Sequence, residues 1–198
     1  MKIIGLCGGS GSGKGVACNF FAELGIPYID TDKVYHDLIS TNSQCTVDLI
    51  STFGEQLNAF PGIDRLKLRE IAFSSQDNLE KLNHITHKHI LQATRSIIKN
   101  IKSDPTVLGV VIDAPLLFES GFDKECDITV CVIADESVRI DRITKRDNIS
   151  TDQALARINA QISNSDLINR CDYSVENNTT VDDLRNKINI VYNKIFMK

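Results

Sequence analysis

A glycine-rich run near the N-terminus carries the strongest chemical signal in this 198-residue sequence. Residues 8–15 read Gly-Gly-Ser-Gly-Ser-Gly-Lys-Gly and directly follow an apolar segment. Gly8, Gly13 and Lys14 match the phosphate-loop pattern G-x-x-x-x-G-K-[ST] in all but its last position, which is Gly15 here. Glycines permit a backbone path along which successive N–H groups converge on phosphate oxygens, and Lys14 would reach the outer phosphates. The run therefore predicts a site for a nucleoside triphosphate such as ATP.

The last position of the pattern normally supplies a hydroxyl that binds Mg²⁺, and Gly15 has none. Mg²⁺ retains several waters and takes few protein ligands, so a water in place of the hydroxyl is compatible with a metal carried by ATP. Asp32 or Asp113 could hold the ion through such waters. A non-catalytic nucleotide-binding module is the alternative that Gly15 leaves open.

The residues around the loop favour a small-molecule kinase over a GTPase. The GTPase patterns N-K-x-D and D-x-x-G do not occur beside it. A kinase needs a carboxylate near the acceptor hydroxyl, and Asp30 and Asp32 follow the second predicted strand, at the sheet edge where ligands bind in such folds. We expect Asp32 to accept the hydroxyl proton, with Asp30 in a supporting role. The alternative is that both are helix N-caps before Lys33.

Arginines on two polar helices could supply positive charge over the transferring phosphoryl group. Arg139, Arg142 and Arg146 stand at i, i+3 and i+7 and share one helix face, while Arg157 lies on the following helix. Such a face is most often solvated surface. A helix pair that closes as a lid would instead bring guanidinium groups to the phosphates and exclude water. We expect Arg146 to contact phosphate in preference to Arg139 and Arg142.

A polar and then apolar segment follows the third predicted strand. Asp113 occupies the position of a carboxylate that holds Mg²⁺ through water, and the run Pro-Leu-Leu-Phe-Glu follows after one alanine. An apolar loop of this kind is either tucked into the core or forms the floor of a ligand site.

The histidines at 84, 87 and 89 form a weak metal signal because no cysteine or carboxylate accompanies them. A polar substrate contact by His87, or an ordinary surface role, is favoured.

Short apolar runs alternate with helical patterns, which predicts an α/β fold with a five-stranded parallel sheet flanked by helices. The expected strands are 2–7, 26–29, 107–112, 128–134 and 173–175. A first helix over 14–24 ends at Gly25, and the continuous apolar strands indicate that both sheet faces are covered.

The remaining segments predict two helical additions to one kinase-like core. The core comprises 1–32, 105–135 and 166–198. Residues 33–104 show helices and no convincing strand, and they are too many for a simple crossover, so we interpret them as an acceptor sub-domain. Residues 136–165 form the lid. Helix N-caps are expected at Asp135, at Ser150 with Gln153 in a capping box, and at Thr180.

Composition excludes several other classes of protein. A net charge of −4 disfavours non-specific nucleic-acid binding, and no apolar run is long enough for a membrane helix. The six cysteines contain no C-x-x-C pair, which disfavours zinc and redox motifs and favours free thiols in the cytoplasm. No obligate protein partner is evident.

With these motifs in hand, the chain resembles the dephospho-coenzyme A kinase family over nearly its whole length. The resemblance rests on the loop at 4–14, on Gly-Ile-Pro-Tyr-Ile-Asp-Thr-Asp within 21–32, on Asp-Ala-Pro-Leu-Leu-Phe-Glu within 113–121, and on shorter matches at 146–147, 156–161 and 171–177. It implies a nucleotide-kinase fold and Mg²⁺-dependent phosphorylation by ATP of the ribose 3′-hydroxyl of dephospho-CoA.

The resemblance also implies which residues form each part of the site. Those expected to be catalytic are Asp32, Lys14 and Arg146. Those expected to bind the nucleotide are Gly8, Gly9, Gly11, Ser12, Gly13, Lys14, Gly15, Val16, Arg146, Arg157, Gln161 and Asn177. Those expected to bind the acceptor are Asp32, His36, His87, Asp113, Leu116, Leu117, Phe118 and Glu119.

Three positions depart from the family pattern. Gly15 replaces the usual hydroxyl residue, Val16 a common threonine, and Lys88 a proline that often follows the histidine. A phosphate-loop kinase of another small hydroxyl or nucleotide acceptor is the alternative within the same class.

Overall fold

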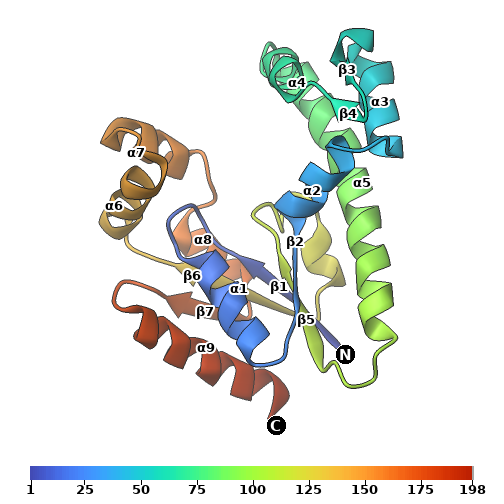
Figure 1. Ribbon diagram of the computed structural model, residues 1–198. Coiled ribbons are helices and arrows are strands. Elements are labelled where there is room, and N and C mark those ends of the chain that lie inside the picture. The colour runs from blue at the N-terminus through green and yellow to red at the C-terminus, as the bar shows by residue number, and fades with distance from the viewer. Residues whose placement is uncertain (198) are drawn as a thin grey trace. The chain divides into compact units, whose positions relative to one another are not determined.

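Five strands form the central sheet of the computed structural model, which describes residues 1–197 (Figure 1). Its order is β2-β5-β1-β6-β7, and the pairs β1/β5, β1/β6 and β6/β7 are parallel. The bounds are β1 Lys2–Cys7, β2 Tyr28–Asp30, β5 Gly109–Asp113, β6 Ile128–Ile133 and β7 Tyr173–Glu176. Every residue of β5 is buried, as expected for a strand covered on both faces. The predicted α/β fold with five strands is confirmed, with strand starts displaced by up to two residues.

The chain divides into two units, the first of which comprises Met1–Ile29 and Ile101–Lys198. Its helices are α1 Lys14–Glu23, α6 Glu136–Asp147, α7 Thr151–Asn159, α8 Asn164–Arg170 and α9 Val181–Phe196, with a 3-10 turn at Phe122–Glu125. Helices α1 and α9 contact one another, and the core between them and the sheet contains Ile4, Leu6, Phe20, Phe21 and Ile188. This core fixes the end of β1 and the start of α1, between which the glycine-rich run lies.

Local capping explains where the helices of this unit begin. Ser150 and Gln153 form the predicted capping box at α7, and the Thr180 side chain accepts a hydrogen bond from the Asp183 N–H at α9. The expectation for Asp135 is wrong in one respect. It occupies the N-cap position of α6, but its side chain makes no capping bond, and its own N–H donates to Asn178 Oδ1 at 2.7 Å.

Helices α6 and α7 share a small apolar cluster of their own. Ile143, Ala154 and Ile158 are buried there, with Ile140 and Ile149 packed against them. The predicted lid segment therefore has a small apolar core of its own, which packs α6 against α7.

The second unit comprises Asp30–Asn100. Its elements are α2 Thr31–Ile39, α3 Gln44–Phe53, a 3-10 turn at Glu55–Leu57, β3 Asn58–Ala59, β4 Gly62–Ile63, α4 Arg65–Ala72 and α5 Gln76–Lys102, which begins in this unit. Ile39, Leu49, Leu57 and Leu68 lie in its core. The prediction that this region contains no strand is wrong. Strands β3 and β4 pair as a short antiparallel hairpin, and two-residue strands are too short to show an alternating pattern.

Candidate active site

The glycine-rich run joins β1 to α1 and leaves the start of the helix open. Gly13 is the N-cap of α1, with a φ of 95° and no side-chain cap. A Cβ at Gly13 would lie 2.2 Å from Asn177 Nδ2, so both the backbone conformation and the space require glycine. The first N–H groups of a helix lack partners within the helix and carry the positive end of its dipole. The uncapped start of α1 is thus suited to binding an anion such as phosphate.

Two residues from outside the loop hold its second half. Asn177 Nδ2 donates to the Ser12 carbonyl at 2.7 Å, and Asn177 is itself buried. Arg142 Nη1 donates to the Gly11 carbonyl at 3.2 Å and to the Asn177 carbonyl at 3.0 Å. Asn177, predicted to bind nucleotide, and Arg142, a weaker candidate for phosphate contact, are both bonded to the loop itself.

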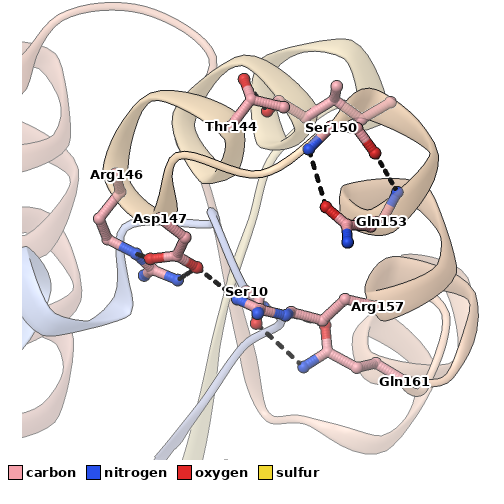
Figure 2. Close-up of polar contacts among 9 residues, drawn as sticks. Ser10, Thr144, Arg146, Asp147, Ser150, Gln153, Arg157 and Gln161 are labelled. Carbon is pink, nitrogen blue, oxygen red and sulfur yellow. Dashed lines mark hydrogen bonds and ion pairs between the residues drawn. The ribbon is translucent and has the colours of Figure 1, made fainter.

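The first half of the loop is held through Ser10. Gln161 Oε1 accepts from the Ser10 N–H at 3.0 Å, and Figure 2 shows this side chain reaching Ser10. Arg139 Nε donates to the Ser10 carbonyl at 2.8 Å, and Arg139 Nη2 donates to Gln161 Oε1 at 2.9 Å. Arg139, like Arg142, was predicted only as a weaker candidate for phosphate contact, and the structure bonds it to the loop itself. Its spacing from Arg142 indicated a shared helix face, but nothing in the sequence showed that this face meets the loop.

Lys14 forms an ion pair with Asp113 Oδ1. The two side chains are 15% and 11% exposed, so the pair is largely shielded from water. Asp113 ends β5 in register with Leu6 of β1, and the loop that follows β1 leads to Lys14 at the start of α1, so strand pairing places the carboxylate beside the lysine. Both residues were predicted for the site on separate grounds, and the structure places them in direct contact.

The predicted lid arginines lie on the surface and share one carboxylate (Figure 2). Arg146 donates twice to Asp147, at 2.7 and 2.9 Å, and Arg157 also pairs with Asp147. The hydrogen bonds from Arg146, and then those from Arg157, hold the pKa of the Asp147 carboxyl well below its usual range. Asp147 therefore holds the two guanidinium groups of α6 and α7 together.

A cavity beside the loop unites several of the predicted residues. Its lining comes from three segments and comprises Cys7, Gly8, Gly9, Pro115, Leu116, Phe118, Glu119, Ala160, Gln161, Ile162 and Leu167. Leu116 is 49% exposed, and the Arg170 guanidinium lies 4.1 Å from the centroid of the Phe118 ring. Leu117, predicted to bind the acceptor, is fully buried and packs toward Gly5, so its side chain belongs to the core.

The predicted acceptor residues of the second unit are distributed over α2 and α5. Asp30 is the N-cap of α2 and accepts from the Lys33 N–H at 3.0 Å. Asp32 lies in the first turn and is exposed, and its carboxylate accepts no hydrogen bond within residues 1–197. His36 on α2 and His87 on α5 are half-buried. The capping alternative thus holds for Asp30 and leaves the Asp32 carboxylate accessible.

Neither the histidines nor the cysteines form a metal site within the described part of the chain. His89 is buried and its Nε2 lies 2.7 Å from Asp48 Oδ2. Cys7 and Cys171 Sγ lie 3.5 Å apart, and all six cysteines are free thiols, as the composition indicated. In residues 1–197 no helix has the length and apolar character needed to cross a membrane.

The start of α1 behind the glycine-rich loop is open, and Lys14 pairs there with Asp113 at the end of β5. Helices α6 and α7 carry arginines, and Arg139 of α6 is bonded to the loop. This arrangement defines a phosphate-loop kinase. The family model described as dephospho-CoA kinase matches residues 2–183. The chain belongs to the dephospho-CoA kinase family. Its predicted activity, the ATP-dependent final step of CoA biosynthesis, is confirmed by this match and by the full-length relatives.

Those relatives cover nearly the whole chain. The dephospho-CoA kinase of Fusobacterium nucleatum is 41% identical over 189 residues, which is 95% of each chain. That of Gamma-proteobacterium EBAC31A08 is 38% identical over 193 residues, covering 97% of this chain and 96% of its own. Among solved structures, TT1252 from Thermus thermophilus superposes with a TM-score of 0.80 at 25% identity, covering 98% of this chain and 97% of its own.

Proposed function

We propose that the chain transfers the γ-phosphoryl group of Mg²⁺-bound ATP to the ribose 3′-hydroxyl of dephospho-CoA, using the residues described above. The observation that carries the assignment is the cavity in which Gly8 and Gly9 of the loop meet Leu116, Phe118 and Glu119. An open helix start would bind the phosphates, and the apolar lining beside it suits a planar base or another weakly polar part of a substrate. We expect the protein to act in the cytoplasm on these two small substrates.

Lys14 would exchange partners when the nucleotide binds. In the structure its charge is neutralised by Asp113, and ATP offers several negative oxygens in its place. Release of Lys14 would free the Asp113 carboxylate to hold Mg²⁺ through water. This arrangement needs no hydroxyl at position 15, where Mg²⁺ would keep another water as ligand.

Asp32 would orient the attacking hydroxyl and accept its proton as the new P–O bond forms. Its exposure and the absence of a hydrogen bond to it within residues 1–197 support this role, since a carboxylate engaged in capping would be less available. Strand β2 ends in the same parallel sheet as β1, and ligands bind such sheets at the carboxyl ends of the strands.

Residues 33–104 would act as the acceptor sub-domain, with His36 and His87 as polar contacts, and residues 136–165 as the lid. Arg146 and Arg157 would turn from Asp147 toward the phosphates when the lid closes. Phosphoryl transfer depends on positioning and electrostatic stabilisation, so the chemical demand on each side chain is modest.

Incubation with ATP, Mg²⁺ and a panel of hydroxyl acceptors tests the proposal directly. We expect ADP and CoA to form with dephospho-CoA as acceptor. Turnover of another nucleotide or small hydroxyl compound without turnover of dephospho-CoA would contradict the substrate assignment. Nucleotide binding without any turnover at saturating Mg²⁺ would indicate a binding module instead.

A further inference from the structure

Arg139 is a buried cation placed directly behind the phosphate loop. It is 4% exposed although it lies on α6, most of whose polar residues face water. Its guanidinium also lies so close to Gly9 that a Cβ there would stand 2.3 Å from Nη2. The loop backbone and the guanidinium therefore pack against each other without an intervening side chain.

The hydrogen-bond partners of Arg139 are all neutral. They are the Ser10 carbonyl and the Gln161 amide oxygen, and no carboxylate forms an ion pair with Arg139 within the described residues. Burial lowers the pKa of the Arg139 guanidinium. The negative charge of Glu136, an exposed acid one helical turn earlier, raises this pKa and only partly offsets burial. Arginine stays charged under these conditions. The protein thus keeps a buried positive charge that its own acids do not balance closely.

A buried charge without a close partner costs free energy in the unliganded protein. A nucleotide triphosphate bound on the open side of the loop would place several negative charges against the same Gly9 and Ser10 backbone that Arg139 contacts from the other side. Their interaction takes place across packed backbone, where screening by water is weak, so the attraction is much larger than on the surface.

We propose that Arg139 is a positioning residue that attracts the phosphates of the nucleotide through the loop, without contact, and fixes the Ser10 peptide on which the loop geometry depends. The inference rests on the proposed nucleotide site and adds a residue to it. It predicts that the contribution of Arg139 to binding increases with the charge of the ligand. A purely structural role predicts equal losses for all ligands of the loop.

The test measures the affinity of the full chain for ATP, ADP and adenosine by isothermal titration calorimetry in wild type, Arg139→Lys, Arg139→Gln and Arg139→Met. We expect Arg139→Met and Arg139→Gln to weaken ATP binding by roughly 10- to 100-fold, ADP by less, and adenosine by under about twofold. Arg139→Lys, which keeps the charge, should retain most of the affinity for ATP. Lys145→Met is the matched control, because Lys145 is an exposed cation on the same helix, paired with Asp141.

Two results would overturn the inference. One is ATP affinity within about twofold of wild type in both neutral variants, and the other is an equal loss for ATP and adenosine. Thermal unfolding without ligand checks that each variant folds. If Arg139→Met does not fold, the comparison of Arg139→Lys with Arg139→Gln decides; if Arg139→Gln does not fold, the comparison of Arg139→Lys with Arg139→Met decides. These measurements need no turnover, so a wild-type protein that binds ATP but does not phosphorylate dephospho-CoA would contradict the proposed function and leave the comparison intact.

Discussion

The Lys14–Asp113 ion pair predicts how the stability and the nucleotide affinity of the protein change when the partner of Lys14 is neutralised. Replacing Asp113 by Asn preserves the shape of the side chain and removes the negative charge that faces Lys14. Breaking a fully buried ion pair costs about 3–5 kcal/mol, and exposed pairs contribute about 0.2–1 kcal/mol. With side chains 15% and 11% exposed, the pair lies between these limits. We therefore expect a loss of about 2 kcal/mol in the free energy of unfolding.

That loss translates into measurable changes in the unliganded and the nucleotide-bound protein. For a chain of this size, about 2 kcal/mol corresponds to a fall in Tm of roughly 4–8 °C. ATP supplies a new anion for Lys14, so the difference in Tm between wild type and variant should shrink when nucleotide is bound. By linkage, Mg²⁺-free ATP should bind the variant more tightly, by up to roughly 30-fold.

Differential scanning calorimetry and titration of ATP in EDTA measure these two effects. Asp141→Asn is the matched control, because Asp141 pairs with Lys145 on the exposed face of α6 and its loss should change stability by under about 0.5 kcal/mol. An unchanged Tm of Asp113→Asn, or weaker binding of Mg²⁺-free ATP, would refute the view that Lys14 pairs with Asp113 in the unliganded protein and exchanges it for phosphate oxygens when nucleotide binds. A fall in kcat with Mg²⁺ present is expected as well, since the carboxylate would no longer support the metal.

Three further expectations concern the acceptor base, the metal and a thiol. Asp32→Asn should retain ATP affinity and lose at least about 100-fold in kcat, because the proton acceptor is gone, and near-normal kcat in steady-state assays would reject the role. Gly15→Ser should lower the Mg²⁺ concentration for half-maximal rate, since nothing lies within 4 Å of a Cβ there and the hydroxyl has room; an unchanged Mg²⁺ titration would show that the hydroxyl is not needed. Hydrogen bonds from Cys131 and then Cys7 lower the pKa of Cys171, so mass spectrometry should detect its alkylation by iodoacetamide at pH 6, below the range of ordinary thiols, and a profile matching an ordinary thiol would contradict this.

Several features of the fold could be predicted because their causes are local. The capping box of α7 needs only Ser150 and Gln153, three residues apart, and the strand β1 is a continuous apolar run before glycines. The hairpin at 58–63 escaped prediction because it consists of two short strands whose pairing depends on the turn between them. Asp135 occupies the predicted N-cap position of α6 without a side-chain cap, and its N–H donates to Asn178, 43 positions away, a contact that no local pattern predicts.

The candidate site likewise has features with local causes and features that depend on contacts between distant residues. The sequence by itself determined the phosphate loop, the kinase class and the family, because these signals lie in contiguous motifs whose residue types and spacing carry the chemistry. Only the tertiary structure decided which partners those residues have. Lys14 meets Asp113 across 99 positions, and Ser10 meets Arg139 and Gln161 across 129 and 151. Contacts over such separations follow from strand order and helix packing, which no local pattern encodes, so the buried cation behind the loop could be found only in the folded chain.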